Sequence, residues 1–106
     1  MIVVIDEATI IEAGRRLSEA APGARVVLFG SQARGDARPQ SDLDFLVVEP
    51  EVENTAVESV RLRRALRGMR IFADVVVVRE RDVEDWREVR GSLIHAALAD
   101  GRVLVA

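Results

Sequence analysis

The sequence predicts an α/β chain in which a small sheet is flanked by helices. Short runs rich in Val, Ile and Leu alternate with longer segments whose apolar residues recur at helical spacing. No repeat or linker divides the 106 residues, so residues 1–106 are expected to form one domain. Apolar residues make up 49% of the chain and charged residues 31%, which is enough apolar surface for a folded core.

The first half of the chain is predicted to contain two helices and two strands. Asp6 can cap a first helix, because its carboxylate can accept from free backbone N–H groups, and Pro22-Gly23 ends that helix. An apolar strand is expected over residues 25–29. A short helix after Ser31 and a polar loop then lead to a second strand over residues 43–48.

The second half is predicted to continue the alternation. Asn54 is the expected cap of a helix that reaches Gly68, where a residue without a Cβ can end it. The β-branched run over residues 71–78 predicts a third strand. Two helices and a short terminal strand are expected after it, at residues 81–88, 90–100 and 103–105.

Charge and composition exclude several classes of protein. The net charge is −3, whereas a general nucleic-acid binder normally carries a basic excess. There is no Cys, so neither disulfides nor a zinc–thiolate site is expected. The N-terminal residues lack the pattern of a secretory signal, and no apolar run reaches membrane-spanning length. We therefore expect a cytoplasmic protein with no membrane contact and no direct nucleic-acid partner.

The most informative segment joins the first two strands. Gly30-Ser31 ends the first strand, and Asp42-Leu43-Asp44 begins the second after ten intervening residues. Because side chains alternate along a strand, Asp42 and Asp44 project to the same side. Two neighbouring carboxylates repel each other unless a cation or a proton lies between them, and Mg²⁺ prefers such oxygen ligands together with phosphates. The glycine–serine turn offers backbone N–H groups to those phosphates.

This pattern resembles the nucleotidyltransferase superfamily that includes DNA polymerase beta, and within it the MNT-type minimal nucleotidyltransferases. The signature of these proteins is Gly-Ser, ten residues and Asp-x-Asp, and the finer pattern Gly30-Ser31-Gln32-Ala33-Arg34-Gly35 also fits. Asp74, in a later strand, matches the third carboxylate of the superfamily. The resemblance covers nearly the whole chain and implies a polymerase-beta-like fold with a mixed sheet.

The resemblance also implies the site. Asp42, Asp44 and Asp74 would be the catalytic carboxylates and would hold two Mg²⁺ ions, with Asp74 binding the ion that activates the attacking hydroxyl. Gly30 and Ser31 would bind the phosphates of the substrate ATP. Arg34 is a further candidate for phosphate binding, or an arginine that is only solvated.

MNT proteins are typically encoded with HEPN toxins and serve as their antitoxins, and some transfer AMP from ATP to a tyrosine hydroxyl of the toxin. The resemblance therefore implies a Mg²⁺-dependent protein adenylyltransferase that silences a partner HEPN ribonuclease in a hetero-oligomer. Two alternatives remain at this point. The protein could neutralise the toxin by binding alone, or it could be a nucleotidyltransferase that acts on a small molecule or RNA.

Overall fold

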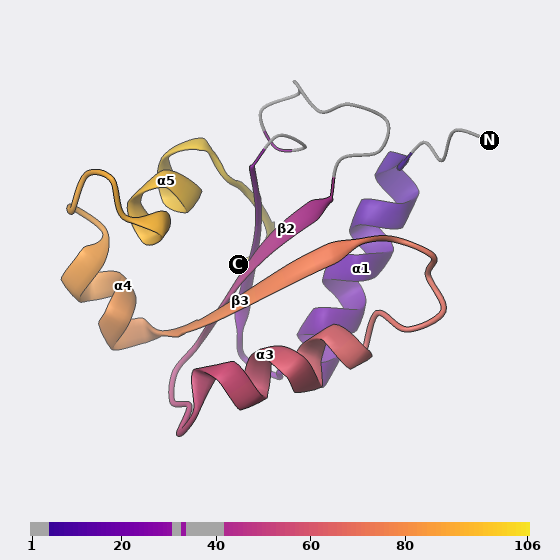
Figure 1. Ribbon diagram of the computed structural model, residues 1–106, viewed down its shortest axis with the longest axis horizontal. Coiled ribbons are helices and arrows are strands. Elements are labelled where there is room, and N and C mark those ends of the chain that lie inside the picture. Colours follow the sequence, from indigo (N-terminus) through magenta and orange to yellow (C-terminus); the bar gives the residue numbers. More distant parts are fainter. Residues whose placement is uncertain (1–4, 31–32, 34–41) are drawn as a thin grey trace.

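The computed structural model describes residues 5–30, residue 33 and residues 42–106, which form helices packed on a sheet (Figure 1). The helices are α1 (Glu7–Ala20), α3 (Thr55–Arg64), α4 (Glu80–Trp86) and α5 (Leu93–Asp100). The strands are β1 (Arg25–Phe29), β2 (Leu43–Glu49), β3 (Ala73–Arg79) and β4 (Arg102–Val105). The short helix expected after Ser31 and the polar loop that follows it lie outside the described residues. Within the described ranges, no helix is long and apolar enough to cross a membrane.

The sheet is mixed, with strand order β3-β2-β1-β4, and this confirms the expected fold class. β1 is antiparallel to both β2 and β4, whereas β2 and β3 are parallel. A parallel pair needs a crossover connection, and α3 supplies it between β2 and β3. As a consequence, β1 ends where both β2 and β3 begin.

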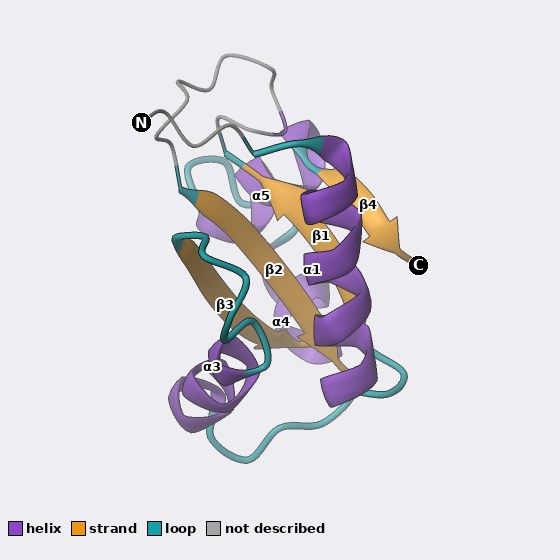
Figure 2. Ribbon diagram, turned by 90° about the vertical axis from the view of Figure 1, so that its right-hand side faces the viewer, coloured by secondary structure: helices purple, strands orange, loops and turns teal. Residues whose placement is uncertain are grey.

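Two helical layers cover the two faces of this sheet (Figure 2). The larger core lies on the α1 and α3 side and takes Leu43, Phe45 and Val47 from β2. The smaller core lies on the α4 and α5 side and takes Leu46 and Val48 from the same strand. All five side chains are fully buried, because a central strand covered on both faces has no solvated side.

Two of the helix caps, Asp6 and Asn54, are those that the sequence predicts. Asp6 accepts a hydrogen bond from the Thr9 backbone N–H at 2.9 Å, and Asn54 does the same for Ala56 and Val57 at 3.1 Å. The last helix begins at Leu93 instead of residue 90, because Ser92 caps it. Each cap satisfies backbone donors that a helix cannot pair internally.

The connection between α3 and β3 is longer than the sequence suggests. The predicted helix to Gly68 ends at Arg64 and continues as turns, and β3 begins at Ala73 instead of residue 71. Gly68 and Arg70 both have positive φ, of 90° and 57°, which neither a helix nor a strand accommodates. The intervening residues therefore form an ordered turn instead of extending either element.

Candidate functional site at one end of the sheet

The topology brings the predicted residues of three strands to one end of the sheet. Phe29, the last residue of β1, pairs with Asp44 of β2, and Asp44 pairs in turn with Asp74 of β3. Gly30 directly follows Phe29. Gly30, Asp44 and Asp74, which are far apart in the chain, therefore lie at the same level across three adjacent strands.

The carboxylates also share one side of the sheet. Asp44 has the strand parity of Leu46 and Val48, which face α4 and α5, and Asp74 has the parity of Val76 and Val78 on the same side. Asp42 precedes Asp44 by two residues and is exposed, as is Asp74, while Asp44 is half-buried. Acidic side chains thus gather where the apolar face of the sheet gives way to solvent.

Gly30 lies directly against the carboxylate of Asp44. Its φ of 79° is in the left-handed region that favours glycine. A Cβ placed on Gly30 would overlap Oδ2 of Asp44 and would lie 3.3 Å from Cγ and 3.6 Å from Cβ of that residue. Glycine is therefore required here both by the backbone conformation and by the position of the Asp44 side chain.

The set of three carboxylates fits a hard divalent cation by its donor chemistry, since all the donors are oxygens. Among the residues that the structure describes, however, no three His, Cys, Asp or Glu side chains form a group that could hold a metal ion. Asp42, Asp44 and Asp74 share the sheet end without closing around one point. Ser31 and Arg34, the predicted phosphate ligands, lie outside the described residues.

A groove of about 590 Å³ opens beside these carboxylates. Asp42 and Asp74 line it together with residues of α3, of the α3–β3 connection and of the start of β3. The groove also carries four exposed arginines, and we call it the arginine groove; they are Arg63, Arg64, Arg67 and Arg70. Of the residues that line it, only Asp42 and Asp74 are predicted from the sequence to belong to a site. The signal was present as the arginine-rich segment over residues 61–70, but arginines near a helix C-terminus also have a purely structural role.

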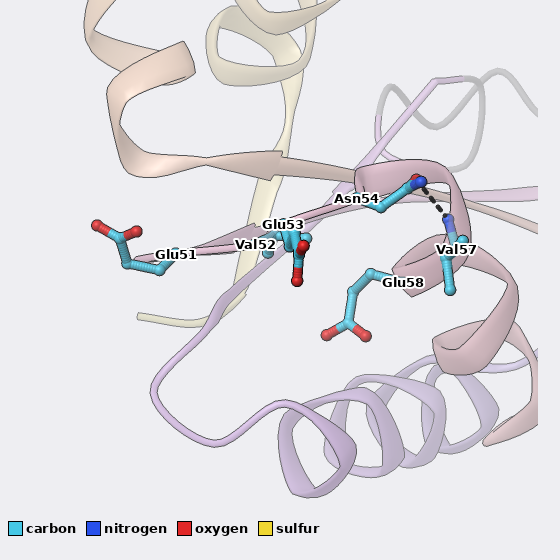
Figure 3. Close-up of a pocket in the computed structure, with 6 residues that line it drawn as sticks. All are labelled: Glu51, Val52, Glu53, Asn54, Val57 and Glu58. Carbon is cyan, nitrogen blue, oxygen red and sulfur yellow. Dashed lines mark hydrogen bonds between the residues drawn. The ribbon is translucent and has the colours of Figure 1, made fainter.

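A second hollow, of about 570 Å³, lies at the opposite end of β2 (Figure 3). Glu51, Glu53 and Glu58 line it, and none of the described residues that line it is basic. Burial and the neighbouring Glu58 carboxyl raise the pKa of Glu49, next to this hollow, to about 7. A hollow lined by negatively charged carboxylates would repel a triphosphate, so it is a poor nucleotide site despite the raised pKa of Glu49.

The fold and the sheet end define a small mixed α/β protein with an acidic site beside a glycine turn. Residues 10–97 match the nucleotidyltransferase domain family, and the chain therefore belongs to that family. No curated protein sequence matches the chain.

Two solved structures share the fold. One is described as a candidate nucleotidyltransferase from Sulfolobus solfataricus; it is 24% identical, with a TM-score of 0.61, and the match covers 91% of this chain and 76% of that one. The other is a toxin–antitoxin structure with AMP-PNP; it is 19% identical, with the same TM-score of 0.61, and the match covers 93% of this chain and 72% of the other. At these identities the likeness establishes the fold and not a shared substrate.

Proposed function

We propose that this protein is a Mg²⁺-dependent adenylyltransferase that transfers AMP from ATP to a tyrosine hydroxyl of a partner HEPN ribonuclease, and so acts as its antitoxin. The observation that carries the proposal is the register of the sheet end. Asp44 lies against Gly30 on one side and pairs with Asp74 on the other. Gly30, the half-buried Asp44 and the exposed Asp74 therefore lie in adjacent positions, which supports a shared site.

Each residue then has a distinct role. Asp42, Asp44 and Asp74 would hold two Mg²⁺ ions, which would supply positive charge to neutralise the triphosphate. Gly30 leaves room for a phosphate to approach the backbone, and Ser31 and Arg34 would bind phosphate oxygens. Most of the catalysis is then positioning and charge neutralisation, as in other phosphoryl transfers.

The transfer exchanges a phosphoanhydride bond of ATP for a phosphodiester bond to the acceptor. The phenolic oxygen of the acceptor attacks the α-phosphorus of ATP, the bond from that phosphorus to the pyrophosphate oxygen breaks, and the phenolic proton passes to solvent. Asp74 is exposed and lines the arginine groove, so an acceptor hydroxyl can reach it from outside the protein. An acceptor on another protein suits this open geometry.

The toxin partner is supported by the solved toxin–antitoxin structure with AMP-PNP, which has the same fold over 93% of this chain. In this proposal the protein works in the cytoplasm as part of a hetero-oligomer with its toxin. A second candidate function, neutralisation by binding alone, is favoured by one observation: the carboxylates in the described part of the chain do not form a closed metal site.

Co-expression with a HEPN toxin encoded beside this protein, followed by mass spectrometry of that toxin, tests the transfer directly. Wild-type protein should add the mass of AMP, and Asp74→Ala should not. Asp85→Ala, which removes an exposed carboxylate from α4, is the matched control and should transfer normally.

Growth rescue at a limiting antitoxin dose then separates catalysis from binding. If turnover protects the cell, Asp74→Ala should still bind the toxin but should fail to rescue growth at that dose. Full rescue by Asp74→Ala would overturn the enzymatic proposal and would favour neutralisation by binding.

A further inference from the structure

We infer that the arginine groove is the docking site for an acidic segment of the acceptor protein, which it holds with the acceptor hydroxyl directed toward Asp74. This inference rests on the proposed function, because it names how the acceptor of that reaction is recognised. The groove and the carboxylates are continuous, since Asp42 and Asp74 line the same depression as the arginines.

The four arginines of the groove have no acidic ion-pair partner within the described chain. Several other arginines pair with nearby carboxylates, as Arg25 does with Glu80 at 2.8 Å and Arg79 with Asp82 at 2.9 Å. No ion pair among the described residues involves any of the four groove arginines. Four arginines that line one groove and belong to no ion pair can bind an anionic ligand, because each guanidinium presents a planar set of donors to carboxylates.

The positions of these arginines are set by an ordered backbone. The Met69 N–H donates to the Leu66 carbonyl at 3.2 Å, and the Leu43 N–H donates to the Phe72 carbonyl at 2.9 Å. Arg70 has a φ of 57°, a conformation that a residue with a Cβ adopts at a cost. The turn therefore holds its side chains beside the start of β3, and Figures 1 and 2 both show the α3–β3 connection rising toward that end of the sheet.

Apolar side chains are interspersed with the charges. Phe72 is 78% exposed and Val60 is 42% exposed, and both line the groove. An exposed aromatic ring beside arginines is the composition of a protein interface, where aromatic residues and Arg are enriched. A polypeptide with acidic and apolar side chains would match both features.

Two observations favour an acidic polypeptide over RNA. Asp42 and Asp74 line the groove together with the arginines, so a continuous phosphate backbone would meet negative charge there, whereas a peptide can place a neutral tyrosine beside them. The chain as a whole carries a net charge of −3, which opposes the long-range attraction on which RNA binding depends. A short acidic segment needs only the local positive charge.

The test uses the whole protein and two classes of probe, without ATP. The first probe is a glutamate-rich peptide with one central tyrosine, compared with its glutamine-substituted counterpart, and the second is a single-stranded oligouridylate. Binding is followed by NMR through the arginine Nε–H signals and by fluorescence anisotropy. The groove variant combines Arg63→Gln, Arg64→Gln and Arg67→Gln with Arg70→Asn, because Asn tolerates the left-handed backbone at position 70.

A second arginine variant controls for net charge. Arg81, Arg87 and Arg90 are exposed and belong to no ion pair among the described residues, so changing all three to Gln removes a similar charge elsewhere. Phe72→Ala tests the apolar contact, and the exposure of its ring means that the fold should tolerate the change.

We expect saturable binding of the acidic peptide in the millimolar range or tighter, and at least about a tenfold loss in the groove variant. The control variant should bind as the wild type does, and Phe72→Ala should bind the peptide more weakly. Equal loss in both arginine variants, no saturation by the peptide, or tighter groove-dependent binding of the oligouridylate would each overturn the inference. Because no nucleotide is present, the result does not depend on whether the protein transfers AMP.

Discussion

Replacement of Gly30 by Ala should displace the carboxylate of Asp44, and its cost can be worked from the structure. A residue with a Cβ at a φ of 79° loses about 1–2 kcal/mol relative to glycine. The new Cβ would also overlap Oδ2 of Asp44, and pushing that side chain off its rotamer costs about 0.5–1.5 kcal/mol. The total loss in the free energy of unfolding is about 1.5–3.5 kcal/mol. Each kcal/mol of this loss should lower Tm by roughly 4–8 °C.

Gly23→Ala is the matched control for this substitution. Gly23 has a φ of 83°, but an added Cβ would meet no atom within 4 Å. Gly23→Ala should therefore lose only the stability that a Cβ at positive φ costs, and it should keep full nucleotide transfer. Gly30→Ala should lose more stability and, in the proposed function, most of the transfer, because the Asp44 carboxylate is displaced from its position beside Gly30 and Asp74.

A double-mutant cycle isolates the contact, with free energies of unfolding taken from urea or thermal denaturation. In an Asp44→Ala background the carboxylate is absent, and only the Cβ of residue 44 remains, 3.6 Å from the new methyl group. Gly30→Ala should then cost no more than Gly23→Ala does. If Gly30→Ala costs the same with and without the Asp44 carboxylate, the close approach inferred between these residues is wrong.

Three further outcomes are expected. Asp44→Asn keeps the shape of a half-buried side chain but removes its charge. ATP-dependent transfer should therefore fall by about two to four orders of magnitude, while the circular dichroism spectrum and Tm stay near those of the wild type. Near-normal transfer would refute the metal-binding role. The pKa of Glu49 is raised from 4.5 to about 7, so the folded state keeps a proton that the unfolded state has released, and this group's contribution to stability falls as the pH rises between those values. Relative to wild type, Glu49→Gln should therefore gain stability above pH 7, by no more than about 1 kcal/mol because solvent screens a partly exposed group, and a variant–wild-type difference that is flat with pH would contradict the shift. Gly101→Ala should lower the free energy of unfolding by about 1–3 kcal/mol although the φ of Gly101 is ordinary, because a Cβ would overlap the Ala97 carbonyl oxygen and lie 2.6 Å from Cγ1 of Val27. A Tm within 2 °C of that of the wild type, which corresponds to about 0.5 kcal/mol, would argue against that packing.

Much of the fold follows from local signals in the sequence. Asp6 and Asn54 cap the helices that they were expected to cap, and the strand at residues 25–29 has the predicted bounds. These features depend on neighbours within a few residues, so capping chemistry and apolar periodicity are sufficient to predict them. The Gly30, Asp42 and Asp44 spacing is equally local, and it alone indicated where to look for a site.

The relation between distant residues was decided by the tertiary structure. The sequence places Asp74 on a strand, but only the parallel pairing of β3 with β2 brings it level with Asp44. A shift of one residue in that register would have turned Asp74 toward the α1 and α3 core instead. Likewise, the contact of Gly30 with Asp44 exists because β1 ends beside the start of β2.

The arginine groove is the clearest case in which the sequence does not show which distant residues lie together. The sequence alone determines that residues 61–70 are rich in arginine, which by itself fits the end of a helix as well as a binding site. Only the folded chain ends α3 at Arg64, turns through Gly68 and Arg70, and sets the arginines beside Asp42 and Asp74. Charges separated by tens of residues act on one ligand only when the backbone brings them within a few ångströms, and no local pattern encodes that distance.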